Sequence, residues 1–251
     1  DVQVNNPWQK KAESLTRSGL GAMDKGQWSV AGMMFERSLQ AATLASDDQL
    51  IALGWYNLGR ARASAGNLAL ARRAYLQAVR QADSTDDAVN SRRAGLAIAM
   101  LNQALPGGKN QPFADALLDV PATFPIDIHL AAARLAMLRG QAGMARESYA
   151  RVLGMAGKDR SGLLYAARAH LGLAELEYQT FFRQANSQRE NAAAWQNLNK
   201  AMDLLSRAGQ PRLMLQVVNL AVALETDADR RLAWQQRAEA LRRALHTASA
   251  D

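Results

Sequence analysis

The sequence predicts an all-α protein, a solenoid of about six antiparallel helical hairpins. The first observation behind this prediction is the scarcity of proline: the chain of 251 residues holds 6, and long segments without it carry apolar residues at helical spacing. The second is a recurring pair, an alanine followed four positions later by an aromatic residue, found as Ala31/Phe35, Ala71/Tyr75 and Ala145/Tyr149. The third is a glycine five positions before each of these alanines, which suits a tight turn after a helix: Gly26, Gly66 and Gly140.

The spacing of these pairs indicates a repeat. Successive alanines of the pairs stand 40 and 74 residues apart, which corresponds to one and two periods of about 34 residues with short insertions in the loops. Two antiparallel helices approach closely only where side chains are small. We therefore expect Gly59 and Ala71 to lie at a close helix crossing, with bulky Trp55, Leu58 and Tyr75 filling the space around it.

The segment that carries Trp55-x2-Leu58-Gly59-x2-Arg62 and then Ala71-x3-Tyr75 resembles the tetratricopeptide repeat family. Arg62 stands where that family has a tyrosine. The resemblance implies a right-handed superhelix in which the first helix of each hairpin lines a concave groove. Members of the family use such a groove to hold an extended peptide or a partner helix.

The predicted hairpins follow one another in a single domain over residues 1–251. The clearest copies of the repeat span 12–45, 52–85 and 126–159, and more degenerate hairpins span 87–122, 161–208 and 211–247. In the first degenerate hairpin the short segment FADALLDV is expected to form the returning helix. The polar stretch QANSQREN is expected to be a loop, and Asp227 or Asp229 to cap the final helix.

The groove implied by the resemblance supplies the candidate binding residues. Helical phase counted from Trp55 predicts that the partner contacts Leu20, Met23, Leu53, Tyr56, Asn57, Arg60, Leu130, Arg134 and Met137. Asn57 matches the asparagine by which family members often bind a peptide backbone, and a solvated side chain is the alternative for it. This mixture of apolar and cationic groups suits a protein or peptide partner that is apolar or acidic.

One known binding mode of the family does not fit. Members that hold the C-terminal carboxylate of a chaperone use lysine and asparagine on the first repeat and basic residues on the third. Thr16, Leu20 and Asp127 occupy those places here. A clamp for chaperone tails is therefore not expected.

The sequence offers no constellation typical of catalysis. The loop PGGKN lacks the glycine and the hydroxyl that a phosphate-binding loop needs, since Gln103 and Asn110 stand in those positions. The histidines are far apart and none has a carboxylate or a second histidine one helical turn away: His129, His170 and His246. Glu175 and Glu177 face different sides of a helix. We expect no enzyme activity, no cofactor, no metal and no small-molecule substrate.

The net charge and the cysteine content indicate which binding partners and which cellular compartment to expect. The formal net charge is +7 and cysteine is absent. A basic surface favours anionic partners, although the arginines are scattered as a solvated helical surface would have them. The absence of cysteine fits an exported bacterial protein, periplasmic or outer-membrane-associated in its mature form, with a cytoplasmic protein as the alternative. The start DVQVNNPWQKK has no apolar signal core, so membrane attachment is expected only through a removed N-terminal signal or lipid anchor.

These observations favour a scaffold or adaptor for protein–protein interactions. The bias toward alanine, arginine and glutamine suggests a bacterial source, and the fold implied by the resemblance suits assembly of a secretion or pilus machine in the cell envelope. Two alternatives stay open: a basic helical-repeat protein that binds RNA or other nucleic acid, and an accessory domain of a larger regulator or enzyme. The sequence leaves the oligomeric state open.

Overall fold

The computed structural model describes residues 6–103, 113–183 and 188–247, and at 113–115, 181–183 and 188–190 it describes the backbone alone. The described residues form α-helices joined by short turns, with no β-strand among them. The chain divides into two compact units, Asp1–Asp119 and Val120–Asp251, and each is described by itself. The predicted all-α hairpin architecture is confirmed, whereas the single domain and its right-handed twist stay predictions.

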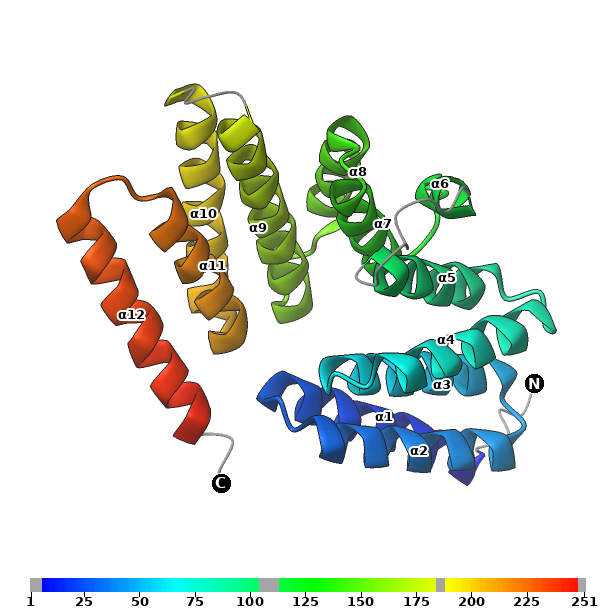
Figure 1. The fold of residues 1–251 in the computed structure, drawn as a ribbon. Helices are drawn as coiled ribbons and strands as arrows, with labels where there is room; N and C mark the ends of the chain where they lie inside the picture. The colour runs from blue at the N-terminus through cyan, green and yellow to red at the C-terminus, as the bar shows by residue number, and fades with distance from the viewer. Residues whose placement is uncertain (1–5, 104–112, 184–187, 248–251) are drawn as a thin grey trace. The chain divides into compact units, whose positions relative to one another are not determined.

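The first unit contains two full hairpins and a shortened third one (Figure 1). Its helices are α1 (Pro7–Lys25), α2 (Trp28–Ala45), α3 (Asp48–Ser64), α4 (Leu68–Asp83), α5 (Ala88–Gln103) and α6 (Phe113–Leu118). Each helix packs against the next along the chain, and the first helices of successive hairpins also touch, α1 against α3 and α3 against α5. The first helices therefore line one side of this stack together.

The second unit repeats this arrangement with longer helices in its middle (Figure 1). Its helices are α7 (Ile126–Leu138), α8 (Ala142–Met155), α9 (Arg160–Arg183), α10 (Gln188–Ala208), α11 (Pro211–Leu224) and α12 (Ala228–Thr247). Here too the first helices meet, α7 against α9 and α9 against α11. The core of this unit is built where α9, α10 and α11 join, around Leu171, Leu198, Leu205 and Val217.

The turns between helices follow the predicted glycines. Gly26, Gly66 and Gly140 adopt left-handed backbone conformations with φ of 73°, 82° and 74°. A residue with a Cβ atom is strained there, and glycine is not. The Gly26 N–H closes the end of α1 by donating to the carbonyl groups of Ala22 and Met23.

Single elements can be compared with the expected ones, and α1 and α3 begin at Pro7 and Asp48, before the predicted hairpin starts at 12 and 52. The returning helix of the third hairpin is α6, only six residues long. Asp227 caps α12, because its Oδ1 accepts the N–H of Arg230 at 2.9 Å. The polar stretch QANSQREN is helical from Gln188 onward, so the predicted loop is wrong for that half, and residues 184–187 lie outside the described residues. The loop PGGKN lies outside the described residues.

The close helix crossings also match the prediction. A Cβ atom placed on Gly59 would lie 2.5 Å from Cε1 of Tyr75, and one placed on Gly19 would lie 2.5 Å from Cε1 of Phe35. The aromatic rings of Phe35 on α2 and Tyr75 on α4 thus rest directly on the backbone of the first helix of their own hairpin. Ala71 is fully buried at the same crossing. Small residues are required here because the ring fills the space that a side chain would occupy.

Candidate binding surface

The side of the first unit lined by α1, α3 and α5 carries the predicted binding residues Leu20, Met23, Leu53, Tyr56, Asn57 and Arg60, and we call it the first-helix face. Leu20 on α1 is 36% exposed. Met23 packs partly against the cluster of Phe35 and Leu58. Leu53, Tyr56 and Arg60 on α3 are half-buried.

Two arginines from neighbouring hairpins approach the ring of Tyr56. The Cζ atom of Arg60 lies 5.8 Å from the centroid of that ring, and the Cζ atom of Arg93 on α5 lies 5.9 Å from it. The Tyr56 ring in turn lies 5.8 Å from that of Tyr75, tilted by 42°. Guanidinium groups are attracted to the negative face of an aromatic ring at such distances. We call Tyr56, Arg60 and Arg93 the arginine–tyrosine cluster.

Each arginine of this cluster is held by an asparagine one turn earlier on its own helix. Nη1 of Arg60 donates to Oδ1 of Asn57 at 3.2 Å, and Nη1 of Arg93 donates to Oδ1 of Asn90. Asn90 is itself fixed, because its Nδ2 donates to Asp87 at 2.6 Å. The two amides are 3% and 8% exposed. They therefore act as buried supports that direct the arginines.

Sequence reasoning missed Asn90 and Arg93. The signal was present, since the motif Asn-x2-Arg occurs at 57–60 and again at 90–93. This separation of 33 residues is close to the period of the repeat. The alternative of a solvated Asn57 is wrong, because its side chain is buried. Its direct contact with a peptide backbone stays a prediction, and at 3% exposure Asn57 offers even less area to a ligand than Leu130 or Met137.

Arg60 and the neighbouring Tyr75 differ in charge. Within the described part of the chain, Arg60 bonds to Asn57 and lies over Tyr56 but makes no ion pair with a carboxylate. Burial raises the pKa of Tyr75, and the nearby Tyr56 raises it further while Arg60 opposes the shift. Tyr75 therefore stays neutral at physiological pH, and the local charge comes from the guanidinium groups.

The remaining predicted residues belong to the second unit. Leu130 and Met137 on α7 are 9% and 7% exposed, so they contribute to its core and offer little area to a ligand. Arg134 on α7 is exposed. Burial raises the pKa of Glu175 on α9, and Arg134 opposes this shift. The structure thus brings Tyr56, Asn57 and Arg60 together in the first unit. The other predicted residues lie in the second unit: Leu130, Arg134 and Met137.

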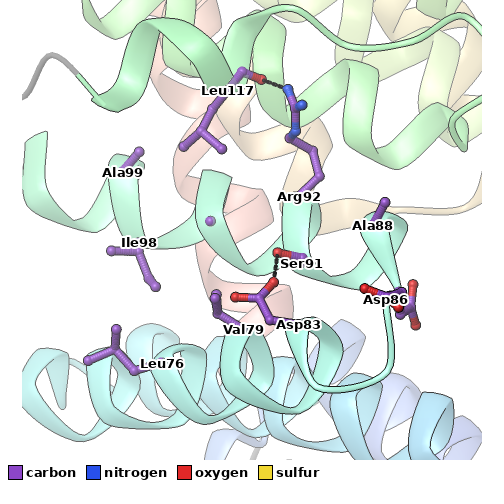
Figure 2. Close-up of a pocket in the computed structure, with 12 residues that line it drawn as sticks. Leu76, Val79, Asp83, Asp86, Ala88, Ser91, Arg92, Ile98, Ala99 and Leu117 are labelled. Carbon is purple, nitrogen blue, oxygen red and sulfur yellow. Dashed lines mark hydrogen bonds between the residues drawn. The ribbon is translucent and has the colours of Figure 1, made fainter.

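A separate hollow of about 780 Å³ lies between α4, α5 and α6 (Figure 2). Leu76, Val79 and Ile98 are among the apolar side chains that line it, and aspartates stand at one end. The hollow exists because α6 is too short to cover the length of α5. The sequence analysis did not predict this hollow, although the short returning segment FADALLDV could have indicated that α5 is incompletely covered.

The polar groups of this hollow serve the fold. Nη1 of Arg92 donates to the carbonyl groups of Ala116, Leu117 and Asp119 at 3.0, 3.0 and 2.7 Å, which fastens the end of α6 to α5. Asp83 accepts the hydroxyl of Ser91 at 2.6 Å (Figure 2). Arg92, Ser91 and Asp83 are therefore hydrogen-bonded within the protein.

Two of the histidines, His129 and His170, are enclosed by the fold to different degrees. His129 is 1% exposed, and burial lowers its pKa, with Arg151 adding to the effect. His170 bonds to Asn197 at 2.9 Å, and burial lowers its pKa as well. No group of three or more histidine, aspartate or glutamate side chains among the described residues could hold a metal ion. No described helix has the length and apolar character needed to cross a membrane.

Comparison with known proteins adds no family assignment. No protein-family model matches the sequence, and no curated protein matches it significantly. The arrangement of the described residues is therefore the basis for assigning a function.

Proposed function

We propose that this chain is a scaffold for protein–protein interactions that binds a peptide or a partner helix on the first-helix face. The observation that carries the proposal is the arginine–tyrosine cluster, which joins side chains of two successive hairpins on one face. A peptide that lies across several hairpins needs anchor points contributed by more than one of them. The resemblance to the tetratricopeptide repeat supports the same use of the first helices.

A role in a bacterial cell-envelope machine is the finer form of this proposal. The absence of cysteine and the bias toward alanine, arginine and glutamine support an exported bacterial protein. A periplasmic or outer-membrane-associated scaffold for secretion or pilus assembly combines this compartment with the proposed peptide binding.

Nucleic-acid binding has less support than peptide binding. Leu20 follows Gly19 as Arg60 follows Gly59, and each of these glycines lies under the aromatic ring of its own hairpin. Leu20 and Arg60 therefore occupy equivalent positions. The position that holds Arg60 on α3 is therefore apolar on α1, whereas a nucleic-acid surface needs basic residues that repeat at equivalent positions along the stack.

The proposal is tested by selecting binders from a library of random displayed peptides with the purified full chain. We expect enrichment over a surface without protein, and measurable affinity of labelled selected peptides by fluorescence anisotropy. Leu20→Glu, on the first-helix face, is expected to weaken binding about tenfold or more, because it places a charge in an apolar contact.

Leu70→Glu supplies the matched control. Leu70 is 44% exposed on the second helix α4, so the same substitution there should leave affinity unchanged. A library that yields no binder would contradict the proposed function. Equal losses for the two variants would place the binding surface elsewhere.

A further inference from the structure

We propose that the hollow between α4, α5 and α6 is a second docking site, and that it takes a helical segment of a partner protein that carries apolar residues together with a lysine or an arginine. The hollow is lined by residues of α4 as well as α5 and has a volume of about 780 Å³. The first-helix face is formed by α1, α3 and α5 instead. Binding in the hollow therefore does not depend on the peptide binding proposed for that face.

The shortness of α6 explains why a helix fits this space. The second helix α4 has 16 residues, whereas α6, the second helix of the next hairpin, has 6. The missing length corresponds to about 15 Å of helix. The side of α5 that a longer second helix would cover is therefore open to the hollow (Figure 1). A helical segment of another protein would complete this hairpin.

The chain does not fill the hollow by extending α6. This helix ends at Leu118, and Pro121 follows. A continued helix would need an N–H at position 121 to bond the carbonyl of Leu117, and proline has none. That carbonyl accepts Nη1 of Arg92 instead, at 3.0 Å. The end of α6 is thus held against α5, and the hollow remains beside it.

The walls of the hollow are apolar. Leu76 and Val79 on α4 lie opposite Ile98 on α5, and Leu117 of α6 borders the same space (Figure 2). Leu76, Val79 and Ile98 are half-buried, so each has apolar surface left to cover. Removing that surface from water favours apolar side chains on the partner. Such side chains spaced by one helical turn would contact both walls.

One end of the hollow is acidic. Three aspartates line it at the turn between α4 and α5, and Arg92 is the cationic side chain among the described lining residues: Asp83, Asp86 and Asp87. Asp83 accepts the hydroxyl of Ser91, and Asp87 accepts the N–H of Asn90. A carboxylate can accept several hydrogen bonds, so these contacts leave acceptor capacity. The whole chain carries a net charge of +7, which makes this acidic end a local exception.

The acidic end specifies the charge of the partner segment. A lysine or an arginine complements the aspartates, and an acidic segment would be repelled by them. Leu76 and Asp83 both lie on α4, seven positions apart, which is about 10 Å along the helix. We therefore expect the cationic residue of the segment about two helical turns from its apolar residues.

The test is a selection from a library of displayed helical peptides of about 14 residues, roughly four turns. The library is first depleted on the triple variant Val79→Gln/Asp83→Asn/Asp86→Asn and then selected on the wild-type full chain. The triple variant keeps the first-helix face, so depletion removes peptides that bind there. Enriched peptides are expected to combine apolar residues at one-turn spacing with a lysine or an arginine about two turns away.

Fluorescence anisotropy of labelled enriched peptides then assigns the binding to the hollow. Val79→Gln and Asp83→Asn/Asp86→Asn are each expected to weaken binding about tenfold or more, and salt should weaken binding to the wild type. Asparagine suits position 86, where φ is 54°, because it tolerates the left-handed conformation. Leu20→Glu, on the first-helix face, should leave the affinity of these peptides unchanged.

Matched variants make the same changes outside the hollow. Asp229→Asn/Glu239→Gln removes an equal charge from exposed positions of α12, and Leu70→Gln removes an exposed apolar side chain from α4. Both are expected to retain the affinity of the wild type. Circular dichroism of every variant verifies that the helices are retained.

Three results would overturn the assignment of the hollow. The first is a depleted library that enriches no peptide, and the second is an equal loss of affinity in the matched variants. The third is dimerisation of the wild type in sedimentation velocity that Val79→Gln abolishes, which would assign the hollow to a second copy of the chain. None of these results bears on peptides that bind the first-helix face, because their affinity is measured separately through Leu20→Glu.

Discussion

Replacing Tyr149 by alanine is expected to lower the free energy of unfolding by about 3–5 kcal/mol. Tyr149 on α8 is 1% exposed. Its ring lies against α9, where a Cβ atom placed on Gly172 would be 2.2 Å from Cζ of the tyrosine. Alanine would leave a cavity between two consecutive hairpins and remove the contacts that hold them together. Urea unfolding followed by circular dichroism measures the effect.

Tyr149→Phe is the matched control for this prediction. The hydroxyl of Tyr149 is buried and has no hydrogen-bond partner among the described residues. Its removal is expected to leave stability unchanged or to raise it by up to about 1 kcal/mol, since an unsatisfied polar group is no longer buried. A loss of less than about 1 kcal/mol for Tyr149→Ala would contradict the placement of this ring in the core.

Gly59→Ala is expected to lower the free energy of unfolding by about 1–3 kcal/mol. At a solvent-exposed helix position the same substitution stabilises the folded protein, because alanine has a higher helix propensity than glycine. At Gly59 the new methyl group would lie 2.5 Å from Cε1 of Tyr75. Tyr75 is 4% exposed, so its ring cannot move aside without displacing neighbours in the core.

Gly21→Ala shows what the substitution does without that obstacle. Gly21 lies within α1, and a Cβ atom placed there would meet nothing within 4 Å. We expect Gly21→Ala to raise the free energy of unfolding by about 0.5–1 kcal/mol. Thermal and urea unfolding measure the stability of both variants. A Gly59→Ala protein that is more stable than the wild type would contradict the close crossing of α3 and α4.

The hairpin architecture could be predicted from the sequence because its determinants are local. Glycines with positive φ lie in the turns that follow the first helices, at Gly26, Gly66 and Gly140, and each is visible in the sequence as a break in the helical pattern. The pairing of Gly59 with Tyr75 also follows from spacing, since both residues belong to one hairpin with a short turn. Periodicity thus predicts which residues meet inside a hairpin.

The candidate site could be predicted only in part, because exposure depends on neighbouring hairpins. Tyr56 and Arg60 share a helix face, and helical phase was sufficient to identify them together. The burial of Leu130 and Met137 on α7 depends on what packs around that helix, including α9, which is 24 residues long against 13 for α7. The approach of Arg93 to Tyr56 depends on how α5 packs on α3, which a pattern within one helix does not specify.

Photo-crosslinking measures directly whether a partner segment binds on the first-helix face. A selected peptide that carries a photoreactive group at its centre would be irradiated on the full chain, and the modified residues mapped by mass spectrometry. We expect modification on α1, α3 and α5, near Leu20 and Tyr56. Modification confined to the second helices α2 and α4 would contradict it.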